Sequence, residues 1–412
     1  MEIFSVQLLY LLRAMLNAQL VNWGLLGFNF FELIAILLFL ALAAAFSLKA
    51  LHKNRHPVSA VEIWAVVLIG WITISYILHA EVSSISQYAK FIIPLMTYIL
   101  LKRILPDRSA HVRMIFLMLI GFLLPFFMSA IMTYQGEGVG HVVYWTGLER
   151  YQGVYSDVHM MGHNAALAIM VTVVYVALRK CQKVPLGWVE LILMATVFIL
   201  GLYLLYASQV RNAYVGLFVF FVVVFYFYDK RILAYFFVLS AAVILLYWSQ
   251  VSIIFYDFLD PPNVSSDVEA IGSGRKTMWT WALERWHQAP LLYQLTGMGN
   301  VPGEFAMTRP RFGTLVDGTI RPWADPHNDW LYVLLSLGLI GLAIFAGLFA
   351  SILRAILSVT GKQKFALLGL FLAVMMMSGM SNSYLTRFTL FQMFFMLMVY
   401  VDLRSTDVSE TA

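Results

Sequence analysis

The sequence predicts an all-α polytopic membrane protein with about twelve spanning helices. Of its 412 residues, 61% are hydrophobic and 12% are charged, whereas a soluble domain is about 45–50% apolar and about 25% charged. Aromatic residues make up 15% of the chain, and Trp and Tyr are typical of the headgroup level of a bilayer. A water-exposed surface needs more polar cover than this chain has, so we expect a lipid-facing surface.

Apolar stretches of sufficient length define the expected spans. A helix needs roughly 20 apolar residues to cross about 30 Å of hydrocarbon. The first stretch is the weakest, because Arg13 lies in its middle. In the alternative it is an interfacial helix, which removes one span and puts the N-terminus outside. The expected spans are 5–23, 28–48, 58–79, 86–104, 112–133, 160–179, 187–206, 211–228, 232–255, 328–350, 363–381 and 385–402.

Basic residues gather in alternate loops, which predicts the orientation. Lys and Arg favour the cytoplasmic side of membrane proteins. With the N-terminus inside, every expected cytoplasmic loop is basic, so we expect both termini in the cytoplasm. The net charge of +5 then reflects topology, and no nucleic-acid partner is expected. The basic residues on this side are Lys49, Lys53, Arg55, Lys102, Arg103, Arg108, Arg113, Arg179, Lys180, Lys183, Lys230, Arg231, Arg354, Lys362, Lys364 and Arg404.

Two loops on the periplasmic side are long enough to contribute structure of their own. One covers about 134–159, and the other covers 256–327. The longer loop divides the chain into transmembrane helices 1–9 (1–255), a periplasmic subdomain, and transmembrane helices 10–12 with a short cytoplasmic tail (328–412).

The longer loop contains an expected amphipathic helix over 275–288. The turn Gly272-Ser273-Gly274 precedes it, and Ser273 is a typical helix cap. Apolar residues recur on one face with a period of 3.6 residues, which predicts a helix lying on the outer membrane surface. The residues of this face are Met278, Ala282, Leu283 and Trp286.

His327 is the first candidate for chemistry. It precedes the tenth span beside Asn328. A helix N-terminus presents free N–H groups and a positive dipole, so it favours anions. A histidine there can bind phosphate or act as a base near neutral pH. A histidine that is merely hydrogen-bonded at a membrane surface is the structural alternative.

Five basic residues are expected at the same depth as His327. Each alone is ordinary, since an arginine can snorkel to the interface or remain a solvated charge. Charges inside spans usually face a cavity, and Arg pairs bidentately with phosphate oxygens. Together they indicate a pocket for a multiply charged anion. These residues are Lys90, Arg150, Arg211, Arg275 and Arg387.

Carboxylate pairs that hold Mg²⁺ or Mn²⁺ are not evident. No D-x-D or E-x-D pair occurs in the periplasmic loops, although metal-dependent phosphoryl or glycosyl transfer normally uses carboxylates. His159 and His163 have the i, i+4 spacing of metal ligands, but no third ligand is evident. We therefore expect no metal and no other cofactor, with arginines neutralising the charge.

The histidine lies in a motif that resembles a known family. His327-Asn328, nine residues, Gly338, two residues and Gly341 match the pattern H-[NSQ]-x9-G-x-x-[GTY] of O-antigen ligases. Ser-Gly-Arg ending at Arg275, with Trp279 after it, is also similar to that family.

The resemblance implies a GT-C-like fold in a Gram-negative inner membrane. Such ligases transfer a glycan from undecaprenyl diphosphate to a sugar of lipid A–core on the periplasmic side, without a metal. It implies His327 as general base or acceptor orienter, with Arg211 and Arg275 binding the diphosphate. Secondary donor or acceptor contacts are expected from Lys90, Arg150, Arg387 and Asn328.

Other functions remain open at this stage. An O-antigen polymerase uses a second donor glycan as acceptor, and a bacterial protein O-oligosaccharyltransferase uses a protein. A transporter of the lipid-linked glycan is the alternative from a different class, and it would be expected to show internal repeats and charges near the bilayer midplane. A purely structural membrane protein does not explain the charges inside the spans.

Overall fold

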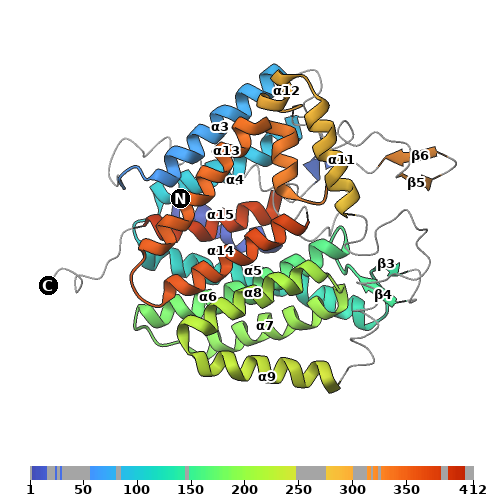
Figure 1. Ribbon diagram of the computed structural model, residues 1–412. Helices are drawn as coiled ribbons and strands as arrows, with labels where there is room; N and C mark the ends of the chain where they lie inside the picture. The colour runs from blue at the N-terminus through green and yellow to red at the C-terminus, as the bar shows by residue number, and fades with distance from the viewer. Residues whose placement is uncertain are drawn as a thin grey trace.

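The chain forms a bundle of helices with three small antiparallel hairpins among its described residues. The structure is a computed structural model, and it describes residues 2–15, 24–25, 28–29, 56–79, 85–143, 148–246, 275–299, 313–316, 319–322, 326–381 and 388–403. Most helices run side by side along one direction (Figure 1). Seven of the described helices are long and apolar enough to cross a membrane.

The described elements follow the expected order along the chain. They are α1 (Glu2–Met15), β1 (Gly24–Leu25), β2 (Phe28–Asn29), α3 (Ala60–Leu78), α4 (Ile85–Ile104), α5 (Arg108–Tyr134), β3 (Val139–Val143), β4 (Leu148–Tyr151), α6 (Val158–Cys181), α7 (Trp188–Ser208), α8 (Arg211–Tyr228), α9 (Lys230–Leu246), α11 (Arg275–Gln288), α12 (Leu291–Thr296), β5 (Gly313–Val316), β6 (Thr319–Pro322), α13 (Asp329–Ser358), α14 (Gln363–Met380) and α15 (Phe388–Asp402).

The third to twelfth expected spans each correspond to a helix in this list, whereas the structure describes only parts of the first two. Expected span 28–48 cannot begin at 28, because Phe28–Asn29 form β2 and pair with β1; residues 30–48 lie outside the described part. Helix α1 begins three residues before the expected first stretch and overlaps it to Met15, whereas residues 16–23 lie outside the described part; Arg13 of α1 is fully buried. The count of twelve spans therefore stays a prediction.

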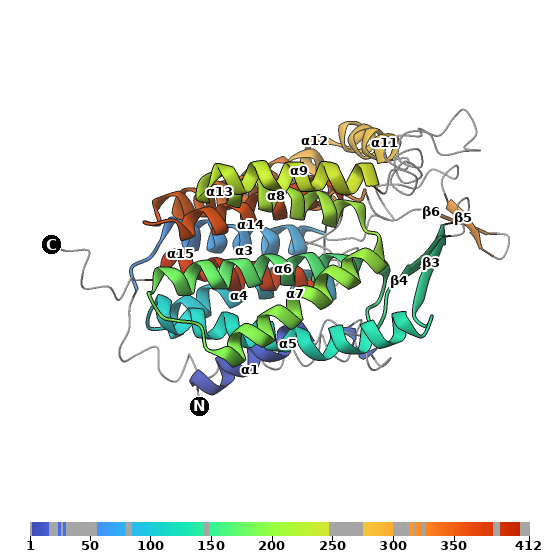
Figure 2. The same cartoon turned by 90° about the horizontal axis from the view of Figure 1, so that it is seen from below.

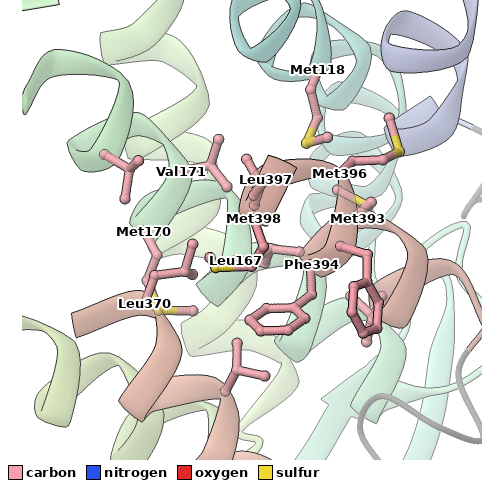
Figure 3. Packing of buried hydrophobic residues seen from close by; sticks show 14 of the residues in the cluster. Met118, Leu167, Met170, Val171, Leu370, Met393, Phe394, Met396, Leu397 and Met398 are labelled. Carbon is pink, nitrogen blue, oxygen red and sulfur yellow. The ribbon is translucent and has the colours of Figure 1, made fainter. Parts of the chain in front are cut away.

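Two helices form the interior of the bundle. All residues of α15 from Leu390 to Val401 are buried, as expected for a helix that is apolar on every side. Figure 3 shows Phe394, Leu397 and Met398 of α15 converging with side chains of the neighbouring helices. Those neighbours are Met118 of α5, Leu167, Met170 and Val171 of α6, and Leu370 of α14. Helix α6 is buried along most of its length.

The outer helices expose large apolar side chains. Val189, Ile192 and Ile199 of α7 are exposed, and so are Val238 and Leu239 of α9. In water such a surface would be unfavourable, whereas in lipid it needs no polar cover. This face fits direct contact with hydrocarbon.

The two ends of the bundle differ in the elements that they carry. We call the end that bears β3 and β4 the hairpin end (Figure 2). The ends of α5, α7 and α14 and the starts of α6, α8 and α13 meet there. Basic residues that the sequence assigned to the cytoplasm, such as Lys180 at the end of α6 and Lys230 at the start of α9, lie at the opposite end.

A buried ionic cluster joins α3, α4 and α15 at the opposite end. Lys102 Nζ lies 2.5 Å from Glu62 Oε2 and 3.3 Å from Asp402 Oδ2. Arg103 adds an ion pair of 2.6 Å to the other oxygen of Glu62, and the Tyr98 hydroxyl donates to Asp402 at 2.5 Å. Lys102 and Glu62 are 1% and 3% exposed, so the charges depend on one another for their solvation.

The Asp402→Asn substitution is expected to lower the free energy of unfolding by about 2 kcal/mol. It removes one of the two negative charges that compensate the buried Lys102 ammonium. Thermal or denaturant unfolding in detergent measures the change. Asp229→Asn is the control, because Asp229 is exposed at the same end of the bundle and should change stability by less than about 0.5 kcal/mol. Equal stability of both variants would contradict this account.

Candidate active site

The start of α13 holds His327 in an unusual backbone conformation. Its φ is 49°, a left-handed value that is uncommon for residues other than glycine, although it is less unfavourable for His than for most. Asn328 then caps the helix, accepting hydrogen bonds from the amides of Trp330 (2.9 Å) and Leu331 (3.1 Å). The cap fixes the turn that presents His327 at the hairpin end.

Asn328 also ties this turn to a second helix. Its side-chain amide donates to the Gly379 carbonyl, near the end of α14, at 2.8 Å. Both polar groups of the Asn328 side chain are therefore engaged by backbone groups. This residue, which the sequence suggested as a secondary substrate contact, joins α13 to α14.

Helix α11 approaches the same turn from the side. It runs across the direction of the bundle at the hairpin end (Figures 1 and 2). The indole N–H of Trp279 donates to the Pro326 carbonyl at 2.9 Å. Arg275 begins α11, one helical turn before Trp279, so its backbone lies close to the His327 turn. The side chain of Arg275 lies outside the described part of the structure.

The apolar face expected for α11 is confirmed in part. Ala282 is 1% exposed, and with Trp286 it packs against Leu335 of α13 and Met298. Leu283 was expected on this face, but it is 44% exposed. The side chain of Met278 lies outside the described residues. The difference arises because α11 turns positions 279, 282 and 286 toward α13, and position 283 then points away from α13.

The break between α7 and α8 presents Arg211 at a helix start. Gln209, with a φ of 52°, ends α7, and the buried Val210 caps α8. Gly162 of α6 allows the close approach, because a Cβ there would lie 2.7 Å from the Ser208 hydroxyl oxygen and 2.6 Å from Val210 Cβ. Arg211 is the first residue of α8, where the free N–H groups favour anions.

The β3–β4 hairpin brings Arg150 to the same break. Arg150 is half-buried, and its Nε donates to the Ser208 carbonyl at 3.0 Å. Burial and the positive charge of Arg211 lower the pKa of Arg150, and the Asp157 carboxylate opposes this shift. The fold thus holds two guanidinium groups within electrostatic range of each other. This hairpin was not expected, because strands of five and four residues are too short for a periodic signal.

Helix α14 connects the arginine pair to the His327 turn. A Cβ at Gly216 of α8 would lie 2.6 Å from Met377 Cγ of α14, so these antiparallel helices touch. Gly379, the acceptor of the Asn328 amide, follows two residues after Met377. Arg211 precedes Gly216 by about 7 Å along α8. The end of α14 therefore lies between the arginine pair and His327.

Of the two remaining candidate residues, the structure describes Lys90. Lys90 is half-buried in α4, next to Phe91, whose ring stacks on Tyr332 in the first turn of α13 at a centroid distance of 5.9 Å. This brings the α4 segment that carries Lys90 close to the His327 turn. Arg387 lies outside the described residues.

The histidine pair of α6 lies near the arginine pair. The rings of His159 and His163 are 6.2 Å apart between centroids, and Gly162 between them contacts Ser208 and Val210. Across the described ranges, no three His, Cys, Asp or Glu side chains gather as a metal site would require. The pair therefore lies on the segment of α6 that packs against the α7–α8 break through Gly162.

Comparison with known families bears on this end of the bundle. Residues 196–346 match the family model described as O-antigen ligase. The matched segment begins within α7 and ends within α13, so it includes Arg211, Arg275 and His327. Arg150 and Lys90 precede it. A search of curated proteins found no match to the chain.

Proposed function

We propose that this chain, of which residues 196–346 match the family model described as O-antigen ligase, transfers a glycan from undecaprenyl diphosphate to a sugar hydroxyl of lipid A–core. The reaction takes place on the periplasmic side of a Gram-negative inner membrane. The observation that carries this proposal is the pair Arg150 and Arg211 at the same end of the bundle as His327.

The arginine pair supports a diphosphate as ligand. Two like charges repel, and this repulsion contributes to the lowered pKa of Arg150. A bound polyanion would relieve it, and Arg matches phosphate oxygens bidentately. The start of α8 adds backbone N–H groups that favour the same charge. We assign Arg211 and Arg275 to the diphosphate, with Arg150 beside them.

The remaining candidates take secondary roles. Lys90 is proposed to contact the donor near the first turn of α13, and Arg387 is kept as a secondary contact on the sequence pattern alone. Asn328 is proposed to hold the His327 turn through its bonds to α13 and α14.

The proposed step is a single displacement with inversion. The acceptor hydroxyl oxygen attacks the anomeric carbon, and its proton passes to the His327 imidazole. The bond between the anomeric carbon and the phosphate oxygen breaks, so undecaprenyl diphosphate leaves with the electron pair. The arginines stabilise the charge that develops on the leaving group. The donor bond supplies the energy, so no cofactor is invoked.

Two observations support the orientation. Basic residues gather at the end opposite to His327, which is typical of a cytoplasmic face. The α11 helix runs across the bundle at the hairpin end, as a helix at a membrane surface would. Both termini are therefore proposed to be cytoplasmic, with the substrates meeting at the periplasmic headgroup level.

Arg211→Lys is expected to raise the donor KM about tenfold, because an ammonium cannot form the bidentate pair with phosphate oxygens. Steady-state transfer by the purified protein, with the donor concentration varied, measures this effect. Arg354→Lys is the matched control, since Arg354 is exposed in the part of α13 distant from His327. A donor KM that is the same for Arg211→Lys as for wild type would contradict the diphosphate assignment.

The lipopolysaccharide profile of a host lacking this gene tests the function itself. Bare lipid A–core with glycan accumulating on undecaprenyl diphosphate, restored by the wild-type gene, would support a ligase. Core bearing a single repeat unit would instead indicate a polymerase. Loss of a glycosylated protein with an intact lipopolysaccharide ladder would indicate a protein O-oligosaccharyltransferase. Donor trapped on the cytoplasmic side would indicate a transporter.

A further inference from the structure

Helix α13 is broken in its first half, at Gly338. This residue has φ 69° and ψ −173°, a backbone region that is essentially restricted to glycine. The break separates a short helix, residues 329–337, from the long remainder of α13. We call residues 329–337 the half-helix. It carries the His327 turn at its start and the break at its end, about 13 Å away.

The broken end exposes carbonyl groups, which other elements satisfy. The last four carbonyls of a helix have no partner within it. Here Leu335 O accepts from the Met298 amide at 2.8 Å. Leu337 O accepts from the Trp71 indole N–H at 2.9 Å. The Ser75 hydroxyl lies 3.3 Å from both Ser336 O and Thr296 O, and its single proton is shared between these two acceptors. Two of these three donors are side chains of α3.

Glycines allow these elements to approach the break. A Cβ at Gly297 would overlap the Ser336 carbonyl, and a Cβ at Gly338 would overlap the Leu295 carbonyl. A Cβ at Gly341 would lie 2.9 Å from Trp71 Nε1. The two glycines of the histidine motif, Gly338 and Gly341, thus shape the break and make room for the Trp71 ring.

We propose that Trp71 and Ser75 are positioning residues that set the direction of the half-helix and hence the place of the His327 imidazole. This inference rests on the proposed function. Both residues lie on α3, outside the segment 196–346 that matches the O-antigen ligase family. The matched segment therefore depends on an N-terminal helix to complete its geometry.

The length of the half-helix makes the catalytic turn sensitive to the break. Without the two α3 donors, the half-helix keeps its bonds at Pro326, Asn328 and Met298 but loses the constraint on one side. A tilt of about 10° over about 13 Å would move the His327 end by about 2 Å. Misplacement of a reacting group by about 1 Å is enough to lower a rate about 10²-fold.

The test compares Trp71→Phe and Ser75→Ala with the wild-type protein in a purified transfer assay. Trp71→Phe keeps an aromatic ring and removes the N–H donor, whereas Ser75→Ala removes a single oxygen. We expect kcat to fall about 10- to 100-fold in Trp71→Phe and about 3- to 10-fold in Ser75→Ala. The donor KM should stay within about twofold in both variants, because Arg211 on α8 and Arg150 on β4 are held by the α7–α8 break and not by the half-helix.

Two controls separate positioning from a loss of folded protein. Binding capacity for undecaprenyl diphosphate, measured on the same samples, gives the fraction of intact sites, and kcat is expressed per intact site. Ser351→Ala also removes a buried hydroxyl, but this one belongs to α13 and bonds within its own helix to Leu348 O. It should leave kcat per site within about twofold of wild type.

The outcomes separate the inference from the function on which it rests. A wild-type kcat per site in Trp71→Phe and Ser75→Ala, with His327→Ala inactive, would overturn the positioning role alone. Equal loss in Ser351→Ala would overturn it too, because the effect would then be general destabilisation. An active His327→Ala variant would overturn both the role of His327 and the inference.

Discussion

Replacement of His327 by alanine is expected to lower glycan transfer at least about 10³-fold, because the variant lacks the proposed general base. The protein should remain folded in the membrane, since the cap of α13 is made by Asn328 and the backbone rather than by the imidazole. Transfer from a lipid-diphosphate donor by the purified variant, beside its unfolding temperature in detergent, measures both effects.

The backbone of His327 requires a second variant. Its φ of 49° favours His and Asn over Ala, so part of any loss in His327→Ala can come from the turn. His327→Asn keeps a residue suited to that conformation and removes the base, and it should be as inactive as the alanine variant. His287→Ala, at an exposed position of α11, is the matched histidine control. Transfer by His327→Asn within tenfold of wild type would rule out the base.

Gly338→Ala is expected to destabilise the protein by about 2–6 kcal/mol and to abolish transfer. The substitution forces alanine into a backbone region that is essentially restricted to glycine, which costs of order 1–3 kcal/mol. Its Cβ would also overlap the Leu295 carbonyl, which adds an overpacking cost of about 1–3 kcal/mol. Unfolding in detergent and the yield of monodisperse protein measure the loss.

A second glycine provides the control for this result. Gly70 lies in α3 beside Trp71, and a Cβ there would have no heavy atom within 4 Å. Gly70→Ala should therefore be neutral or stabilising by up to about 1 kcal/mol, since alanine favours a helix over glycine. If Gly338→Ala and Gly70→Ala unfold at the same temperature, the fold does not require the break in α13.

Sequence patterns predicted the features that depend on a single segment. The spans corresponding to α3–α9 and α13–α15 follow from the length of each apolar stretch, because each helix satisfies its own backbone groups in lipid. The positions of Arg211 and His327 at helix starts were predicted for the same reason. The site residues themselves stay proposals, since only experiments on substrates test their roles.

Several local expectations failed where neighbouring segments decided the outcome. Leu283 fits the apolar period of α11, yet it is exposed because α13 covers a different face. Phe28 was expected to begin a span, yet it pairs in a hairpin. The β3–β4 hairpin was not expected, because its five- and four-residue strands are too short for a periodic signal beside long apolar helices.

The sequence by itself therefore determined that the chain belongs in a membrane, where most of its helices run, and which residues start them. The length of an apolar stretch and the residue types at a helix start are local features, because each depends only on residues that are consecutive in the chain. The tertiary structure decided that Arg150 donates to the Ser208 carbonyl within electrostatic range of Arg211. It also decided that Trp71 and Ser75 bond to carbonyls at the break in α13. These contacts join segments more than 50 residues apart, and only the packing of the whole bundle brings such segments together.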